Sequence, residues 1–582
     1  MVWHIGNTTV RTPYRLIAAL SALRTSKFNG SLSGQERETE FALFLDELDL
    51  VTTDAGGTNV SSLGRKWRAA LSQLGFITPA LTRNFPSGQV DPRLKPITDQ
   101  VPGLTGRQYE ITPSGLRLAS STNFLEQQDC YLRALAAYQI PSPLERGGGT
   151  PFSPLRHAIR LLLNLQNMGA AARFSFEEFA LIVQTSTAEE PIQDVCARLV
   201  DFRAARAAAA GNVRAFDRIA YEQASDRYNL VAGTFIDYAD LSMRYLKATG
   251  VFQSSGRGIS LSPGRRLVSE LLAAEPEITL TDDAYLVRLW RGAELPTDNV
   301  SDSVAVIEDL RARLGDRGVE RPAPISATDQ QQLDSYRFEL EIELRHLDEE
   351  EYATAQAEKL EEIACWLQAL ATGSVITGPS GERIAVPKGE APAYLEWALW
   401  RAFLAINSLN NKPWEARRFQ IDQDFLPVGC APGGGPDAYF EYDQEVIVLE
   451  ATLSDSSRQE AMEGEPVRRH VADFEQRYGG NKKVYGLFVA KNINSNTAHT
   501  FRMGEWYLPD DTPLFVDIVP LRIDQLLALL RSDLTQPRRL RRELITLLAG
   551  ARQLATRHAP QWKQEIARLI QRVSTVPAEP AN

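Results

Sequence analysis

Two carboxylates in the last third of the sequence, Asp437 and Glu450, have the types and spacing of a cation site. Asp437 follows a cluster of three glycines, and Glu450 follows the apolar run 446–449. That short, β-branched run predicts a buried strand. A carboxylate at the end of such a strand is costly to bury alone, so it needs a partner or a cation. Residues 438–444 predict a preceding strand and a turn, and this hairpin would bring the two carboxylates side by side.

Three further side chains are candidates for the same site. Glu396 lies in an apolar, tryptophan-containing stretch that predicts a helix over 392–408. Glu465 and His470 lie in a segment that predicts a helix start, with Pro466 at the first helical position. Two or three carboxylates suffice for Mg²⁺ when a phosphate and waters complete its oxygen shell. The alternatives are an ion pair for Glu396, a helix-dipole partner for Glu465 and a hydrogen-bonded core histidine for His470.

The charge is unevenly distributed along the chain. The 582 residues carry a formal net charge of −11, which argues against a nucleic-acid partner, but residues 1–120 hold 13 Lys/Arg against 10 Asp/Glu and are therefore net +3. A local basic face is enough for a domain to bind DNA. A normally solvated surface is the alternative. The candidate DNA-contacting residues are Arg11, Arg15, Arg65, Lys66 and Arg68.

One pattern occurs twice in the N-terminal half. Residues 67–79 and 244–253 each read as an amphipathic helix that ends at a glycine, Gly75 or Gly250. Each is followed by a short strand, a loop, a second strand and a helix start at a Ser-Pro or Thr-Pro pair. This order predicts two winged-helix domains. The pattern is weakly specific for DNA binding, because many winged helices bind only protein.

The pattern along the chain predicts a multidomain protein with a mainly α N-terminal half. A helical linker should connect that half to an α/β nuclease-type domain, because strands expected at 484–490 and 514–520 are flanked by helices. The expected regions are a winged-helix-like recognition subdomain at 1–125, a second helical and winged-helix subdomain at 126–320, the linker at 321–374 and the cleavage domain at 375–582.

The sequence also bears on the compartment. No run approaches the roughly 18 uncharged apolar residues of a membrane span. The N-terminus lacks the basic and apolar regions of a signal peptide. The four cysteines are far apart and form no CxxC pair. A cytoplasmic protein without a membrane partner is therefore expected.

The candidate site resembles that of a known nuclease family. Asp437 after a proline, followed by Glu450 two residues before Thr452, is similar to the metal site of the PD-(D/E)xK nucleases, although Thr452 stands where Lys is usual. The order of four features resembles the AlwI-like family of type IIS restriction endonucleases and their nicking relatives. These are Glu396, the Pro-Asp pair, Glu-Ala-Thr and the run at 465–470. Residues 3–13 are similar to the opening of that family, and the resemblance spans essentially the whole chain.

The resemblance implies a function and roles for the site residues. An N-terminal domain would read a short asymmetric site in double-stranded DNA, and the C-terminal domain would cut at a fixed distance outside it with Mg²⁺. Asp437 and Glu450 would be the principal metal ligands, with Glu396 as a third. Glu465 and His470 would be further site residues. Family members also carry Thr at the position of Thr452, and the residues that read bases do not transfer between them.

The number of active sites limits how both DNA strands are cut. One chain contains one set of candidate residues, and the sequence has no heptad run long enough for a stable coiled-coil dimer. We therefore expect a free monomer that needs a transient dimer or a small partner subunit to cut the second strand. The alternatives are a strand-specific nicking endonuclease, the large subunit of a heterodimeric enzyme, a modification-dependent or structure-specific nuclease, and a catalytically inactive DNA-binding protein with a degenerate nuclease fold.

Overall fold

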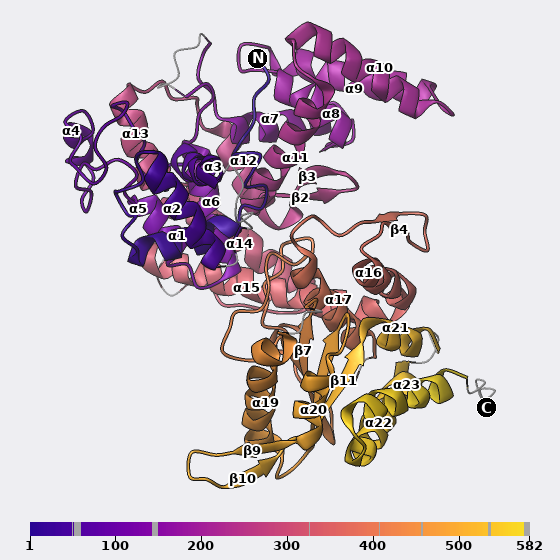
Figure 1. The fold of residues 1–582 in the computed structure, drawn as a ribbon. Helices are drawn as coiled ribbons and strands as arrows, with labels where there is room; N and C mark the ends of the chain where they lie inside the picture. The colour runs from indigo at the N-terminus through magenta and orange to yellow at the C-terminus, as the bar shows by residue number, and fades with distance from the viewer. Residues whose placement is uncertain are drawn as a thin grey trace. The chain divides into compact units, whose positions relative to one another are not determined.

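The computed structural model describes residues 1–48, 50–51, 60–142, 149–324, 326, 328–406, 408–454, 458–532 and 537–575. The chain forms two compact units, Met1–Ile342 and Glu343–Asn582, whose elements can be followed in Figure 1. The division falls inside the predicted linker 321–374, and the finer division into four regions stays a prediction. In the described ranges, no helix combines the length and apolarity that crossing a bilayer demands.

The first unit is mainly helical, and polar side chains begin several of its helices. Thr112, Asn123 and Ser153 each accept a hydrogen bond from a first-turn backbone N–H, which satisfies a donor that the helix leaves free. Ser175 and Glu178 form a capping box, in which each side chain accepts a hydrogen bond from the other residue's backbone N–H. The helices are α1 (Arg15–Thr25), α2 (Gln35–Glu47), α3 (Val60–Gln73), α4 (Lys95–Thr98), α5 (Pro113–Ala119), α6 (Phe124–Ala137), α7 (Pro154–Asn167), α8 (Phe176–Leu181), α9 (Ile192–Ala208), α10 (Val213–Tyr228), α11 (Ala232–Ala248), α12 (Arg266–Ala274), α13 (Asp282–Arg291) and α14 (Val300–Asp316), with 3₁₀ turns η1 (Val183–Thr185), η2 (Pro263–Arg265) and η3 (Pro296–Asp298).

The second copy of the repeated pattern forms a small antiparallel sheet. The strands β1 (Arg173–Phe174), β2 (Phe252–Ser255) and β3 (Gly258–Leu261) are ordered β1-β3-β2. Gly250 has φ +74°, so the predicted left-handed turn between α11 and β2 is confirmed. The helix–strand–strand–helix order expected at 244–267 is therefore present.

The first copy of the pattern differs from its prediction. Between α3 and α5, the described residues make only isolated antiparallel bridges, Ile77 to Ile111 and Val90 to Arg107, and no regular pair of strands. The intervening segment contains several prolines, which cannot donate hydrogen bonds to a ladder. The expectation of two wing strands here is wrong.

A buried ionic cluster stabilises the first unit. Glu341, on α15 (Gln330–Thr354), lies 3.0 Å from the Arg265 guanidinium and 2.9 Å from that of Arg337. Burial alone would raise the pKa of the Glu341 carboxyl, but the two guanidiniums outweigh burial and lower it. The carboxylate therefore compensates two cations that are themselves almost fully buried.

Glu341→Ala should lower the free energy of unfolding of the first unit by about 3–5 kcal/mol, because it leaves buried charges unpaired. Denaturant or thermal unfolding measures this loss. Glu339→Ala, at an exposed position of the same helix, is the matched control and should change stability by less than about 0.5 kcal/mol. Equal effects of the two substitutions would contradict the buried cluster.

The second unit is built around a four-stranded mixed sheet. The strands β6 (Ala438–Glu441), β7 (Glu445–Thr452), β8 (Lys483–Ala490) and β11 (Ile518–Arg522) are ordered β11-β8-β7-β6. Only β6 is antiparallel to its neighbour. The predicted hairpin and the predicted strand at 484–490 are confirmed. The amino end of β6 and the carboxyl ends of the three parallel strands consequently share one edge of the sheet.

The single strand expected at 514–520 is two strands instead. β10 (Pro513–Phe515) pairs with β9 (Glu505–Tyr507) in a separate hairpin, and β11 begins at Ile518. Asp517 lies between the two strands and forms ion pairs with Lys483 and Arg552. The strand pairing therefore changes at Asp517. Its ion pairs are with residues far away in the sequence, so the local sequence pattern does not reveal the change.

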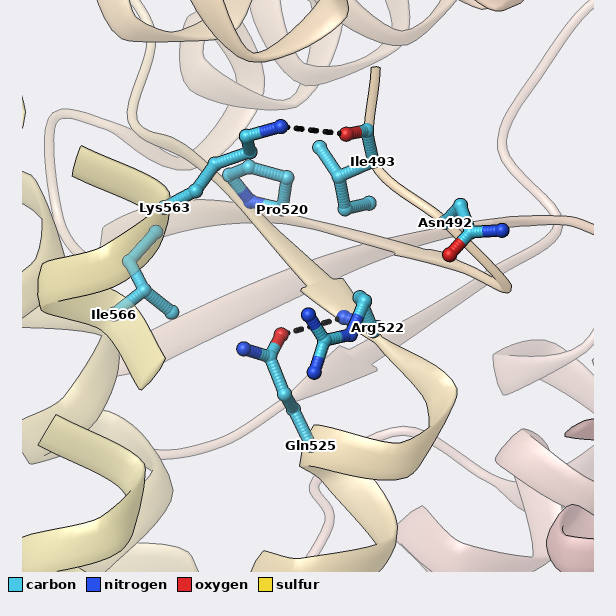
Figure 2. Close-up of a pocket in the computed structure, with 7 residues that line it drawn as sticks. All are labelled: Asn492, Ile493, Pro520, Arg522, Gln525, Lys563 and Ile566. Atoms are coloured by element: carbon cyan, nitrogen blue, oxygen red, sulfur yellow. Dashed lines mark hydrogen bonds between the residues drawn. The ribbon is translucent and has the colours of Figure 1, made fainter. Parts of the chain in front are cut away.

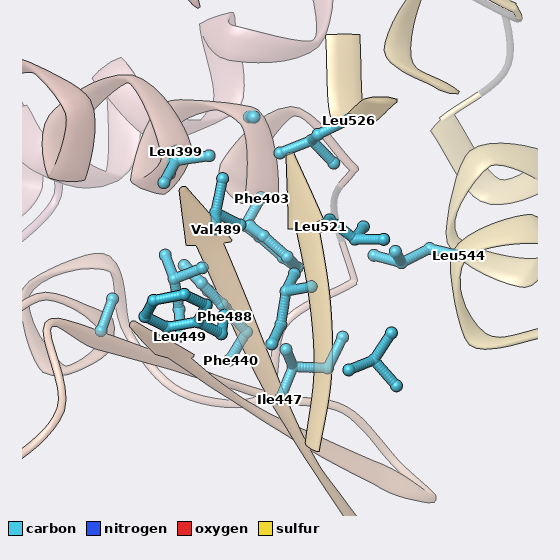
Figure 3. Packing of buried hydrophobic residues seen from close by; sticks show 14 of the residues in the cluster. Leu399, Phe403, Phe440, Ile447, Leu449, Phe488, Val489, Leu521, Leu526 and Leu544 are labelled. Atoms are coloured by element: carbon cyan, nitrogen blue, oxygen red, sulfur yellow. The ribbon is translucent and has the colours of Figure 1, made fainter. Parts of the chain in front are cut away.

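Helices cover both faces of this sheet. Figure 3 shows Leu399 and Phe403 of α17 (Ala391–Ile406) packed with Ile447 and Leu449 of β7 in one apolar cluster. The ring of Phe403 stacks on that of Phe440 at 4.1 Å. Since side chains alternate along a strand, residues 448 and 450 point to the opposite face. α19 (Gln459–Tyr478) packs against β7 and β8 on that opposite face.

Gly486, in the middle of β8, permits a close approach of α19. A Cβ atom at this position would lie 2.6 Å from Val471 Cγ2 on α19 and 2.9 Å from Ile518 Cγ1 on β11. Separations below 3 Å are not tolerated by real side chains, so a larger residue would force α19 away from the sheet.

The remaining elements complete the second unit. The apolar helix predicted at 392–408 is confirmed as α17. The described chain is therefore mostly helical, with its larger, mixed sheet in the C-terminal part. The other elements after α15 are η4 (Ala355–Lys359), α16 (Leu360–Thr372), β4 (Ile376–Thr377), β5 (Arg383–Ile384), α18 (Pro413–Ala416), α20 (Ser495–Met503), α21 (Ile523–Ser532), α22 (Pro537–Gln553), η5 (Leu554–Thr556) and α23 (Ala559–Thr575).

Candidate active site

The hairpin of β6 and β7 places Asp437 level with Glu450. Ala438 pairs with Leu449 in the ladder, so the residue before Ala438 lies opposite the residue after Leu449. Asp437 Oδ2 accepts a hydrogen bond of 2.7 Å from the backbone N–H of Ala451. The structure therefore brings together the two carboxylates that the sequence predicted to meet.

Arg418 fixes the loop that leads into Asp437. Its backbone N–H donates to the carbonyl of Asp437, and its guanidinium donates to the carbonyls of Gly433 and Pro436, each at 3.2 Å. A Cβ atom on Gly435 would lie 2.6 Å from Arg418 Nη1, so a larger residue here would displace the guanidinium from its present position.

Glu396 reaches the site from α17. One carboxylate oxygen accepts a 2.7 Å hydrogen bond from the backbone N–H of Ala431, and the side chain of Cys430 also hydrogen-bonds to it. The side chain of Glu396 is buried. Within the described residues it forms no ion pair with a cation, and its strongest charged neighbour is Asp437. The ion-pair alternative for Glu396 is therefore not supported.

α19 contributes His470 and a further acid, Glu463. His470 Nδ1 lies 2.6 Å from Glu450 Oε1, and Glu463 is hydrogen-bonded to the side chain of Thr452. Residues seven positions apart lie on the same face of a helix, two turns from each other. The histidine and this glutamate accordingly face the same end of β7.

Glu465, which the sequence assigned to the site, points elsewhere. Its side chain is 55% exposed and pairs with Arg469 at 3.1 Å, one turn along the exposed side of α19. The helix begins at Gln459, so Pro466 lies inside it and not at its first position. That proline leaves a backbone carbonyl without its helical partner near Met462, whose exposure gives water access. Both the helix start and the placement of Glu465 are corrections to the sequence-based expectation.

Burial and mutual repulsion favour the protonated forms of these acids. Burial raises the pKa of Asp437, and the charge of Glu450 raises it further. The pKa of Glu396 is raised in the same way by burial and by Asp437. Burial and then Glu463 raise the pKa of Glu450 to about 8. The site therefore holds several carboxylates whose negative charge is not balanced by nearby cations.

The donor chemistry of these residues fits a hard divalent cation. Asp437, Glu450 and Glu396 offer oxygen ligands, and a bound cation would relieve the repulsion that raises their pKa values. Within the described residues, no three His, Cys, Asp or Glu side chains converge as a ready-made metal cage. Mg²⁺ commonly takes only one or two carboxylates from a protein, with phosphate and water completing its shell.

Comparison with known proteins decides the family. The family model described as AlwI restriction endonuclease matches residues 72–529, which is most of the chain. The chain belongs to the AlwI restriction endonuclease family. This confirms the family expected from the sequence, and with it membership of the restriction endonucleases, which are nucleases of restriction–modification systems.

Two other comparisons add little to the AlwI assignment. Among solved structures, the chain is similar to the small subunit (R.BspD6I2) of the heterodimeric restriction endonuclease R.BspD6I, at 23% sequence identity and a TM-score of 0.26. That match covers 36% of this chain and 97% of the subunit. No curated protein matches the sequence.

The basic residues expected to contact DNA are in different environments in this AlwI-family chain. Arg11 forms an ion pair of 2.7 Å with Asp237. Arg68 is only partly exposed, pairs with Glu38 at 2.7 Å and stacks over the Tyr109 ring. Arg15 begins α1 and is partly buried, whereas Arg65 and Lys66 are exposed on α3. All five remain predictions, and Arg11, Arg65 and Lys66 are the exposed ones.

Two residues near the AlwI-type site were missed by the sequence reasoning. Arg418 donates hydrogen bonds to carbonyls of a loop that is distant in the sequence, and no local motif identifies it as a site residue. Glu463 did leave a signal, because counting back two helical turns from His470 reaches residue 463 and not 465. Treating Pro466 as the helix start hid that signal.

Proposed function

We propose that this AlwI-family protein is a Mg²⁺-dependent type IIS restriction endonuclease. It recognises a short asymmetric sequence in double-stranded DNA and hydrolyses phosphodiester bonds at a fixed distance outside that sequence. The observation that carries the proposal is the meeting of Asp437, Glu450 and Glu396 at one edge of the sheet, with pKa values raised by burial and mutual repulsion.

The metal-binding role falls to Asp437 and Glu450, with Glu396 beside them. The N–H groups of Ala451 and Ala431 orient two of these carboxylates, and His470 Nδ1 fixes the third at Glu450. Bound Mg²⁺ would lower the pKa of a water molecule and stabilise the charge that develops on the scissile phosphate. The backbone and histidine contacts prepare the oxygen atoms for that role before DNA arrives.

Glu463 is our candidate for the proton acceptor. Its pKa is raised by burial, which suits a group that must accept a proton near neutral pH. In the proposed reaction the oxygen of water forms the new bond to phosphorus, and the Glu463 carboxylate takes one proton of the water. The ester P–O bond breaks with its electron pair on the leaving oxygen, which takes a proton from solvent. Thr452, at the motif position where Lys is usual, donates its hydroxyl hydrogen to Glu463 and orients it.

The recognition role is proposed for the first unit. Supporting it are the order α11, β2, β3 and η2–α12, which is that of a winged helix, and the exposed basic residues Arg65 and Lys66. The exposed basic residues of α3 suit contacts to DNA phosphates, while the base-reading residues vary with the recognised sequence.

Incubation of the purified protein with methylation-free plasmid and Mg²⁺ tests the function. Sequencing of the fragment ends should show cuts at one fixed offset from a common asymmetric sequence. Cuts at scattered positions would overturn the type IIS assignment, and intact plasmid at every divalent-cation concentration would favour an inactive DNA-binding protein.

The order of the two strand cuts provides a further prediction. Because one metal site cannot face two antiparallel strands in the same geometry, nicked circles should accumulate before linear DNA. The rate of the second cut should rise with protein concentration, as expected for a transient dimer. Direct conversion of supercoiled to linear plasmid at a concentration-independent rate would contradict this. An end point of nicked circles would identify a nicking enzyme or the large subunit of a heterodimer.

A further inference from the structure

A second polar hollow lies at the same edge of the sheet as the candidate active site. It is a cavity of about 230 Å³ between the ends of β8 and β11 and the helices α21 and α23. Figure 2 shows its side chains converging from these separate elements. The lining residues are Asn492, Ile493, Pro520, Arg522, Gln525, Lys563 and Ile566.

The lining of this cavity is cationic. It contains two cations and two amides but no carboxylate. Lys563 Nζ donates one hydrogen bond of 2.9 Å to the Ile493 carbonyl, which uses one of its three N–H groups. Arg522 uses two of its five N–H groups on Asp524, which is outside the lining. Both cations therefore keep donors for another acceptor.

Lys563 and Arg522 also act on each other. The pKa of the Lys563 ammonium is lowered, first by burial and then by the charge of Arg522. Arg522 has its counter-ion in Asp524, outside the lining, and this ion pair raises the pKa of the guanidinium, whereas Lys563 has, among the described residues, only the Ile493 carbonyl as a partner. An anion in the cavity would supply a counter-charge for Lys563 and accept hydrogen bonds from both side chains.

The strand register fixes where this cavity lies relative to the active site. Pro520 is in register with Phe488, which is in register with Glu450. Residues paired across a parallel sheet point to the same face, so the cavity opens on the face that carries the Glu450 carboxylate. The backbone positions of Pro520 and Glu450 are two strand spacings, or about 10 Å, apart, so a phosphate held in the cavity would lie close to one held at the carboxylates.

Gln459 ties the two regions together. Its side-chain amide donates 2.8 Å hydrogen bonds to the carbonyls of Ser454, after β7, and Asn492, after β8. Its carbonyl oxygen accepts from the backbone N–H of Asn494 at 2.9 Å. Gln459 is fully buried, so the spacing between the two loops is held by a satisfied internal network.

We propose that the Arg522–Lys563 pocket binds one backbone phosphate of the DNA, close to the scissile phosphate. Its function is to set the register of the DNA on the cleavage unit, so that a single bond faces the carboxylates. This inference rests on the proposed nuclease function and names a further DNA contact of the same unit, separate from the acids that carry out hydrolysis.

A scan with neutral phosphates tests the pocket in the full-length protein. Duplexes that contain the recognised sequence would carry one methylphosphonate at each position near the cut, on either strand. In the wild type, a methylphosphonate at one position close to the cut should weaken binding about 5- to 20-fold and shift or slow cleavage. In the Lys563→Gln/Arg522→Gln variant, the same replacement should cost nothing further, because its partner is already absent.

Salt dependence supplies a second measurement. Each substitution, Lys563→Gln or Arg522→Gln, should lower the slope of log K against log salt by about one. Lys563→Arg, which keeps the charge, should retain most of the affinity. Arg568→Ala removes an exposed cation from the same helix and is the matched control, with binding expected to be unchanged.

The outcomes separate the pocket from the proposed function. If wild-type protein neither cuts nor binds any duplex, the proposed nuclease function fails. If the wild type cuts normally but the double variant responds to every methylphosphonate as the wild type does, the pocket proposal alone is overturned. If Arg568→Ala weakened DNA binding as much as the Lys563 and Arg522 substitutions do, the pocket proposal would also be overturned. The loss of affinity would then come from surface charge in general. Circular dichroism of each variant verifies that the fold is intact.

Discussion

Asp437→Asn and Glu450→Gln should each slow DNA cleavage by at least about 10³-fold, while specific binding of the duplex stays within about threefold of wild type. Each substitution removes a negatively charged oxygen from the proposed cation site but preserves the size of the side chain. Loss of metal-assisted catalysis costs several kcal/mol in the transition state, and each 1.4 kcal/mol is a factor of ten in rate. Recognition is proposed for the other unit and should persist.

Single-turnover cleavage and a mobility-shift assay measure these two effects. Glu463→Gln and Glu465→Gln provide a matched pair, because the two residues are two positions apart on α19 but face opposite ways. Glu463→Gln should slow cleavage by about 10²-fold or more, as expected for loss of a general base. Glu465→Gln should leave the rate unchanged. A wild-type rate for Asp437→Asn, or a larger loss for Glu465→Gln than for Glu463→Gln, would overturn the assignment of the site.

Glu450→Gln should raise the melting temperature of the metal-free protein at pH 8.5 by on the order of 5 °C. The folded-state pKa of Glu450 is raised to about 8, whereas the unfolded value is about 4.3. Between these values the folded state binds the extra proton. Wild-type stability therefore falls as the pH rises through this window, and the penalty is complete above pH 8. Glutamine carries no such penalty.

The advantage of the glutamine variant should shrink as the pH falls from about 8 to about 4.3, below which the acid is protonated in both states. Adding Mg²⁺ at pH 8.5 should stabilise the wild type more than the variant, because the cation binds the ionised carboxylate. Glu465→Gln serves as the control and should show no such pH dependence. Equal melting temperatures of Glu450→Gln and the wild type at pH 8.5 without metal would show that no penalty attaches to ionising Glu450.

The hairpin that carries Asp437 and Glu450 could be predicted because its information is local. An apolar run, a polar turn and a preceding aromatic strand specify two paired strands, and strand pairing then places the acids opposite each other. The apolar helix that carries Glu396 was predictable for the same reason. In both cases the residues that determine the element lie inside it.

The features that the sequence did not predict depend on tertiary partners or on an ambiguous signal. Arg418 contributes through hydrogen bonds to loop carbonyls fifteen and eighteen residues away. The division of the strand at Asp517 depends on Lys483 and Arg552. Pro466 was ambiguous, since proline is frequent at a helix start and is tolerated inside a helix only where the freed carbonyl finds another partner. That ambiguity determined whether Glu463 or Glu465 was assigned.

Catalysis should be sensitive to substitution of Gly486, although this residue touches no substrate. α19 carries Glu463 and His470, β7 carries Glu450, and the closeness of helix and sheet at Gly486 sets the reach between them. Adding one methyl group there would lift the helix by part of an ångström and stretch the 2.6 Å contact between His470 and Glu450. Relatives could therefore lose activity through changes in packing volume beneath the site while every acidic residue is retained, and an intact set of acids would not by itself identify an active enzyme.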